Sequence, residues 1–262
     1  MRTKPPNAET PAPLLYRWDD IVLSFSASSL LNQHSHGAAE LVVSLSQPVR
    51  TILGSQQVSA RSVLIPPGVD HQNVHADAVS ATIYLDVESF CYRALAAQMT
   101  PEYSVYTGLP EEGGVRRTLS TVYEKEPDAA ECYSLVVEQY LTGSSQRNKV
   151  LDRRVAEVVS TLRSNPSISA SVKSLAGQVN LSEDRLHHLF TTEMGLPVNR
   201  YRIWLRLRLA SLRYLNGRTL TSAAHEAGFS DAAHFSRAFS RMFGAAPGKI
   251  LAERRASKVH FS

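Results

Sequence analysis

Two stretches near the C-terminus decide the fold: LAGQVNLSEDRLHHLF, residues 175–190, and SAAHEAGFSDAAHFSRAFSRMF, residues 222–243. Each predicts a helix of small residues, a short turn, and a second helix that begins at a serine and carries an apolar, aromatic face. The serines expected to cap the second helices, Ser182 and Ser230, are 48 residues apart. The pattern predicts two helix-turn-helix units, whose second helices can enter successive major grooves of DNA.

One long helix is expected to join the two units. Residues 198–216 follow Pro197 and precede Gly217, which are typical residues for the start and the end of a helix. At about 1.5 Å per residue this helix extends about 28 Å, close to the ~34 Å between successive major-groove faces. We expect Arg206 to be partly buried and paired. The other arginines are expected to face solvent or DNA phosphate: Arg202, Arg208 and Arg213.

The outward side chains of the second helices are the candidates for contacts with DNA. In the first unit, the acidic and imidazole groups are expected to reach base edges, and Arg185 to lie beside the backbone. In the second unit, Arg237 is expected to contact a base, guanine being the favoured partner of arginine. The complete expected set is Asp184, Arg185, His187, His188, Ala233, Ser236 and Arg237.

The charge is divided between the two halves of the chain. The 262 residues suit two domains, and the net charge of +4 hides a contrast between them. Residues 1–149 carry 11 Lys and Arg against 16 Asp and Glu, whereas residues 150–262 carry 17 against 8. A basic half joined to an acidic half is expected of a protein that docks on DNA; a solvated basic surface is the alternative.

The N-terminal half predicts strands followed by helices. Residues 15–86 contain short runs rich in Val, Ile, Leu and Tyr, separated by turn residues, which indicates a small antiparallel sandwich or barrel. Residues 87–142 then predict a helical hairpin, whose apolar stripe suits either a dimer interface or the domain core. The polar segment GSSQRNK, residues 143–149, is expected to be a linker. We therefore predict an α+β chain: an arm at 1–14, a sensing domain at 15–142, this linker, and an all-α domain at 150–262.

The compartment is predicted from cysteine usage and from the N-terminus. Two cysteines are too few for a disulfide framework, which favours a reducing cytoplasm. No apolar run approaches the ~18–20 residues that span a bilayer. The N-terminal MRTKPPNAETPAP has no apolar core, so a signal peptide is not expected.

One signature in the C-terminal half resembles a known family. GFSDAAHFSRAFSRMFGAAPGKI, residues 228–250, is similar to the GF-S-x-x-x-F-x-R-x-F-x-x-x-x-G-x-x-P pattern of the AraC/XylS family of bacterial regulators. The resemblance covers residues 151–251. It implies a transcription regulator that binds double-stranded DNA and a small-molecule effector. We expect a homodimer that forms through residues 87–142, with RNA polymerase as a further candidate partner.

The N-terminal domain resembles another family. HSHGAAE, residues 34–40, and PPGVDH, residues 66–71, are similar to the two motifs of the cupin superfamily, whose barrels can hold a divalent metal. The matching ligands would be His34, His36, Glu40 and His71, a donor set that suits Ni, Zn, Fe(II) or Mn. AraC-like regulators usually keep this barrel as an effector pocket without metal.

Two functions remain for the N-terminal domain. We expect no resident cofactor and an organic effector, with the four motif residues in the pocket wall; a bound divalent metal is the alternative. A metal-dependent cupin enzyme would be a different class of protein. It is not expected, because the sequence offers no further acid, base or nucleophile set and two helix-turn-helix units would be left unexplained.

Overall fold

The computed structural model describes residues 14–27, 31–74, 79–141, 151–167, 170–255 and 258–261. Residues 1–13 of the predicted arm and the whole predicted linker, 143–149, lie outside this range. The elements of the N-terminal part are β1 Leu14–Arg17, β2 Ile21–Ala27, β3 Ala39–Ser44, β4 Val49–Leu53, β5 Gln56–Ala60, β6 Ser62–Ile65, β7 Gln72–Val74, β8 Val79–Leu85, α1 Phe90–Ala96, β9 Thr100–Glu102, β10 Val105–Thr107, α2 Glu112–Lys125, α3 Ala129–Cys132 and the π-helix η1 Tyr133–Leu141. The elements that follow are α4 Arg153–Ser164, α5 Val172–Gln178, α6 Glu183–Met194, α7 Val198–Leu215, α8 Leu220–Glu226, α9 Ala232–Phe243, α10 Pro247–Arg255 and β11 Lys258–Phe261.

The strands form two sheets, as the alternating and apolar runs predict. One has eight strands in the order β11-β1-β2-β8-β3-β6-β10-β9, and the other has three in the order β5-β4-β7. Every pair of neighbouring strands is antiparallel except β1 and β11. The first strand begins at Leu14, inside the range predicted as an arm.

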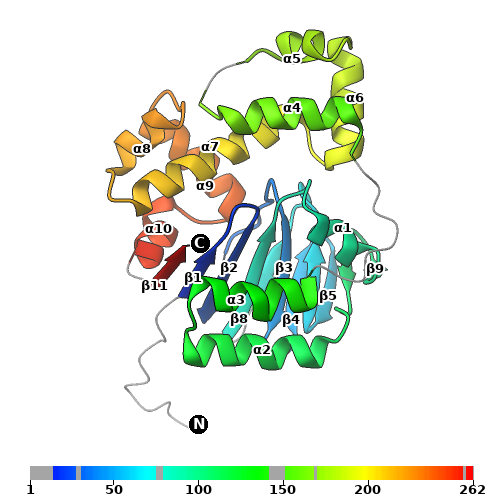
Figure 1. The fold of residues 1–262 in the computed structure, drawn as a ribbon, viewed down its shortest axis with the longest axis vertical. Helices are drawn as coiled ribbons and strands as arrows, with labels where there is room; N and C mark the ends of the chain where they lie inside the picture. Colours follow the sequence, from blue (N-terminus) through cyan, green and yellow to red (C-terminus); the bar gives the residue numbers. More distant parts are fainter. Residues whose placement is uncertain are drawn as a thin grey trace.

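The helical hairpin covers one side of the large sheet (Figure 1). Val115, Leu119 and Val122 of α2 and Val136 of η1 are buried in the same apolar core as the strands. The 3.6-residue period of α2 places its three apolar residues, four and three positions apart, on one face of that helix. Of the two uses predicted for the apolar stripe, these residues serve the core.

Three strands lie where the sequence predicts none. The short strands β9 and β10 follow α1, and β10 pairs with β6. The C-terminal strand β11 joins the N-terminal sheet through β1, with Leu14 opposite Lys258 (Figure 1). Strands of three or four residues are too short to show a period, and β11 depends on a partner more than two hundred residues away.

The helices α4 to α10 form the second domain around an aromatic core. Phe190, Tyr201, Phe235 and Phe239 are almost completely buried in it. The long helix α7 has 18 residues and ends before Gly217, whose φ of +93° is a left-handed conformation that glycine adopts without strain. The predicted long helix between the two helix-turn-helix units is confirmed.

The arginines of α7 differ in part from expectation. The guanidinium of Arg206 is partly buried and donates to the carbonyl oxygens of Pro166 and Ser167, at 3.0 and 3.4 Å, as predicted. Arg208 was expected in solvent or near phosphate, and this expectation is wrong. Its Nη1 lies 2.5 and 2.6 Å from the two carboxylate oxygens of Asp86, in the N-terminal domain.

No helix in the described ranges combines the length and the apolar composition that crossing a bilayer requires.

Candidate nucleic-acid interface and barrel cluster

The first helix-turn-helix consists of α5 and α6. Asn180 in the turn has a φ of 55°, a left-handed conformation that asparagine tolerates better than most residues. The Ser182 side chain accepts from the backbone N–H of Arg185 and caps α6, as predicted. Leu186 and Phe190 are fully buried, so the opposite face of α6 is turned outward.

The second helix-turn-helix consists of α8 and α9, and its predicted cap is wrong. Asp231, not Ser230, caps α9: its Oδ1 accepts from the backbone N–H of His234 at 2.6 Å. The Ser230 hydroxyl instead donates to Asp231 Oδ2 at 2.9 Å. The hydrogen bonds from His234 and Ser230 lower the pKa of the Asp231 carboxyl below its usual value. Adjacent serine and aspartate are both good caps, so the sequence does not distinguish them.

The position of the cap at Asp231, one residue later than predicted, changes the alignment of the two recognition helices. The first helices begin 48 residues apart, at Val172 and Leu220, whereas α6 and α9 begin 49 residues apart, at Glu183 and Ala232. The second turn therefore holds one more residue than the first. With the helices aligned on their starts, Arg237 occupies the sixth position of α9 and His188 the sixth of α6.

All seven residues predicted to contact DNA lie on α6 and α9 and reach the surface. The exposed members of the set are Asp184, Arg185, His188, Ala233 and Arg237. The half-buried members are His187 and Ser236. The structure thus places the set on the two helices as expected.

The two recognition helices differ in charge. The first turn of α6 carries Glu183 and Asp184, whereas the first turn of α9 carries no acidic residue. Carboxylates in the first turn interact favourably with the helix dipole, but they repel the phosphate groups of DNA. Arg237 and Arg241 are exposed on α9. This helix is therefore better suited to approach a phosphate backbone.

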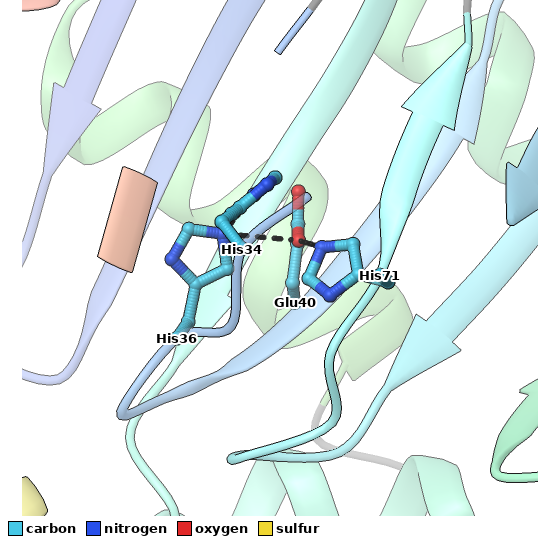
Figure 2. A group of neighbouring side chains, drawn as sticks. All are labelled: His34, His36, Glu40 and His71. Atoms are coloured by element: carbon cyan, nitrogen blue, oxygen red, sulfur yellow. Dashed lines mark hydrogen bonds and ion pairs between the residues drawn. The ribbon is translucent and has the colours of Figure 1, made fainter. Parts of the chain in front are cut away.

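The N-terminal domain brings together the four residues of its two motifs (Figure 2). Glu40 lies on β3 of the large sheet, and His71 immediately precedes β7 of the small sheet. Two backbone hydrogen bonds between His34 and His71, of 2.8 and 2.9 Å, hold the two motifs side by side. His36 completes the cluster, and each of the four residues is at most 4% exposed.

Backbone carbonyls orient two of the imidazoles. The carbonyl oxygen of Asn32 lies 2.7 Å from His34 Nδ1, and that of Val69 lies 2.9 Å from His71 Nδ1. A carbonyl can only accept, so both Nδ1 atoms carry the proton and both Nε2 atoms face the cluster. This is the arrangement by which proteins usually orient metal-binding histidines.

The carboxylate of the cluster pairs with two of its imidazoles. Glu40 Oε2 lies 2.8 Å from His71 Nε2 and 3.2 Å from His36 Nε2. Burial opposes ionisation of Glu40, but the facing His36 and His71 hold the pKa of its carboxyl well below its usual range. Burial likewise disfavours charge on His71, yet the hydrogen bond to Glu40 raises its pKa. Burial, followed by the neighbouring His36, lowers the pKa of His34 to about 3, so this imidazole is neutral.

The donor set fits a divalent transition metal. One ligand atom from each of the four residues lies within 4.8 Å of the others. Neighbouring ligands of an ion with bonds of about 2.1 Å are separated by about 3 to 4 Å, so small adjustments would complete such a site. Three imidazoles and a carboxylate suit Zn, Ni, Fe(II) or Mn.

The cluster lies at the junction of the two domains. The ring of His36 lies 5.4 Å from that of Phe243, at the end of α9, and 6.4 Å from that of Trp204 in α7. The backbone N–H of Asn32 donates to the carbonyl of Gly244 at 3.0 Å. The motif residues are therefore in contact with the helix predicted to recognise DNA.

An ionic group at the same junction was not predicted. Asp86 follows β8, and its carboxylate receives Arg208 of α7 and, at 3.3 Å, Arg163 of α4. Glu88 Oε1 accepts from Arg163 at 2.5 Å and from the Tyr201 hydroxyl at 2.8 Å. These pairs are 75 to 122 residues apart in sequence, so no local spacing identifies them.

Comparison with known proteins agrees with this architecture. Residues 175–253 match the family model of a helix-turn-helix domain. The chain is 26% identical over 121 residues to the Msm operon regulatory protein of Streptococcus mutans, covering 46% of this chain and 44% of that protein. It is 33% identical over 100 residues to the HTH-type transcriptional regulator YidL of Escherichia coli (38% and 34%), and 32% identical over 104 residues to the arabinose operon regulatory protein of that organism (39% and 36%). Each match thus covers less than half of the relative.

The whole fold is similar to a solved structure. ToxT from Vibrio cholerae aligns over 90% of this chain and 99% of its own, with a TM-score of 0.58 and 12% identity. A second structure of that protein, described as bound to an unsaturated fatty acid, aligns over 96% and 97% with a TM-score of 0.56 and 12% identity.

Two exposed recognition helices on one connecting helix define a tandem helix-turn-helix protein with an N-terminal β domain. The sequence matches are more specific: the C-terminal domain is similar to those of the transcriptional activator RhaS and the arabinose operon regulatory protein, in agreement with the resemblance that the signature at residues 228–250 carries.

Proposed function

We propose that the protein is a cytoplasmic transcription regulator that binds double-stranded DNA and changes this binding when an effector occupies its N-terminal half. The observation that carries the proposal is the pair of exposed recognition helices, α6 and α9, in a domain with a net charge of +9. The matched relatives are named as regulators, not as enzymes. The proposal is therefore a binding function rather than catalysis.

The second recognition helix is proposed to supply most of the phosphate and guanine contacts. It carries Arg237 and Arg241 on its exposed face, whereas α6 presents Glu183 and Asp184 at its start. Acidic groups can accept from cytosine, so α6 would contribute base preference more than affinity.

The test is selection of a binding site from random DNA, followed by gel shifts with the full chain. Binding should weaken steeply with salt, because cationic side chains displace counterions from DNA. The selected site should span two neighbouring major-groove segments. Failure to enrich any sequence, with equal affinity for all DNA, would leave only a basic surface and contradict the proposal.

The proposed partners beyond DNA rest on the family resemblance. They are a second copy of the chain, which would pair through residues 87–142, and RNA polymerase. The apolar residues of α2 are used in the core, so a dimer through this region would use the polar outer faces of its helices. Sedimentation at micromolar concentration tests the dimer.

For the N-terminal half, we propose two candidate effectors. The AraC resemblance favours a small organic molecule, and the ToxT structure shows that a protein of this fold can be obtained with one bound. The converging ligand atoms of His34, His36, Glu40 and His71 favour a divalent metal. A metal-sensing regulator is therefore the second candidate function, and metal titration distinguishes the two.

A further inference from the structure

Both recognition helices end against the N-terminal domain. Helix α6 ends at Gly195 and α9 ends at Gly244, and both glycines have a left-handed backbone, with φ of 71° and 70°. Helices often end in this way, so the conformation by itself indicates no function. The neighbours of the two glycines are the distinguishing feature, because each glycine lies against one of the two loops that carry the histidine motifs.

Gly244 lies against the first motif loop, residues 32–37. Its carbonyl oxygen accepts from the backbone N–H of Asn32 at 3.0 Å. A β-carbon on Gly244 would lie 2.5 Å from the carbonyl oxygen of Asn32 and 2.9 Å from His34 Nδ1. The same carbonyl of Asn32 orients the imidazole of His34. Asn32 therefore connects the end of α9 with an imidazole of the cluster.

Gly195 lies against the second motif loop, residues 66–71. A β-carbon on Gly195 would lie 3.2 Å from Pro67 Cγ, and one on Gly68 would lie 3.1 Å from the carbonyl oxygen of Gly195. Gly217, after α7, is also left-handed, but an added β-carbon there would meet nothing within 4 Å. The close contacts are thus specific to the ends of the two recognition helices and are not a general property of helix ends in this chain.

The two motif loops are joined to each other at the histidine cluster. The backbone N–H of Gly68 donates to the carbonyl oxygen of His36 at 2.9 Å, next to the paired backbones of His34 and His71. His34 and His36, on the first loop, face His71, on the second (Figure 2). A divalent ion bound by these imidazoles and by Glu40 would cross-link the loops on which both recognition helices end.

The joined loops are a second connection between the two helix-turn-helix units, besides α7. Five of the seven residues predicted to contact DNA are exposed in this arrangement, so the contacts at the helix ends leave the recognition faces open. Reading two neighbouring grooves requires a fixed relation between α6 and α9. A relation that is fixed before DNA binds removes part of the ordering cost of binding.

We propose that a divalent metal in the histidine cluster holds the ends of both recognition helices through the two motif loops and thereby strengthens DNA binding. The inference rests on the proposed function in its metal-sensing form and names how that site would act on DNA. Its structural elements are the contact of Asn32 with Gly244 for α9 and the contact of Pro67 and Gly68 with Gly195 for α6.

Hydrogen exchange on the full chain tests whether metal acts on the helix ends. Addition of Zn²⁺ to chelator-treated protein should slow exchange at least threefold in peptides covering residues 190–197 and 239–246. Peptides covering residues 213–220, around Gly217, are the internal control and should not change. His36→Ala, which removes a ligand, should remove the effect at both helix ends. Slower exchange in the motif loops alone, or at one helix end only, would overturn the proposal.

Glycine substitutions test the coupling in the reverse direction, because coupling between two sites is reciprocal. Gly244→Ala and Gly195→Ala each place a methyl group against a motif loop and should weaken Zn²⁺ binding at least fivefold in calorimetric titration. Gly217→Ala imposes left-handed strain without a neighbour and should change the affinity less than twofold. Circular dichroism shows whether each variant is folded, and Gly195→Ala, with the looser contact, keeps the test decisive if Gly244→Ala does not fold. Equal weakening in all three variants would contradict the coupling.

Gel shifts on the selected DNA site complete the test and separate its failure from that of the proposed function. Zn²⁺ should tighten binding by the unaltered chain at least fivefold and should have no effect on His36→Ala. Sequence-specific binding that Zn²⁺ leaves unchanged or weakens would overturn this inference and leave the regulator. Helix ends that Zn²⁺ protects in a chain without sequence-specific DNA binding would support the coupling and contradict the regulator.

Discussion

Gly37, in the loop before β3, lies directly against Trp204 of α7, in the other domain. A β-carbon on this glycine would lie 2.3 Å from Trp204 Cβ and 2.5 Å from its Cγ. Both atoms are near the backbone of a long helix, so neither can swing aside. The close approach of the two domains at this point requires glycine.

Gly37→Ala should therefore lower the stability of the docked chain. Forcing an extra methyl group into a filled contact typically costs about 1–3 kcal/mol. Urea unfolding followed by tryptophan fluorescence measures the loss. Gly177→Ala is the matched control, because that glycine lies in helix α5 with nothing within 4 Å of the added carbon. It should raise stability slightly, by about 0.5–1 kcal/mol. Equal effects of the two substitutions would contradict the tight contact.

The carboxylate of Asp86 is the second determinant of docking that can be tested. Asp86→Asn removes the charge that faces Arg208 and Arg163 while keeping the shape of the side chain. Breaking a buried pair costs about 3–5 kcal/mol, but the two arginine side chains are 23% and 34% exposed, so we expect about 2–3 kcal/mol.

The control for Asp86 uses the same substitution at the same junction. Asp70 faces Arg200 of α7 at 3.9 Å, but its side chain is 66% exposed. Asp70→Asn should cost less than about 1 kcal/mol because water screens this pair. A comparable loss for both variants in urea unfolding would show that the burial of Asp86 is unimportant.

The sequence predicted the elements whose signals are local. Periodic apolar residues and turn residues identified both helix-turn-helix units. Motif spacing identified the four residues of the histidine cluster, including His36. The cap of α9 was placed one residue too early because Ser230 and Asp231 have nearly equal capping preference. The pairing of Arg208 with Asp86 and that of Arg163 with Glu88 depend on how the domains dock. No residue near either arginine in sequence signals these contacts.

Metal binding by the histidine cluster is tested by calorimetric titration of chelator-treated protein with Zn²⁺ and Ni²⁺. We expect one ion per chain, with release of protons, because the His71 Nε2 that hydrogen-bonds to Glu40 would have to give up its proton to bind a metal. The proton release appears as a dependence of the measured heat on the buffer.

His36→Ala should abolish the isotherm. His225→Ala, at an exposed histidine of α8, should leave it unchanged. Absence of any isotherm in the unaltered chain would leave a small organic molecule as the remaining candidate effector. Binding that survives His36→Ala would place the metal elsewhere.

Arg237 tests the proposed reading of DNA by α9. Arg237→Ala should weaken binding to the selected site by about 1–3 kcal/mol and relax the preference at one base pair, because a bidentate contact with guanine discriminates by this amount.

Arg241, exposed one turn later on the same helix, is the control. Arg241→Ala should weaken specific and random DNA alike and reduce the salt dependence by about one counterion, as expected of a phosphate contact. His188, at the equivalent position of α6, should give a smaller loss when changed to alanine, because an imidazole lacks the fork of donors with which a guanidinium binds guanine. Gel shifts on the selected and the random sequence at two salt concentrations measure all three variants. If Arg237→Ala weakens both sequences equally, Arg237 contacts phosphate rather than a base.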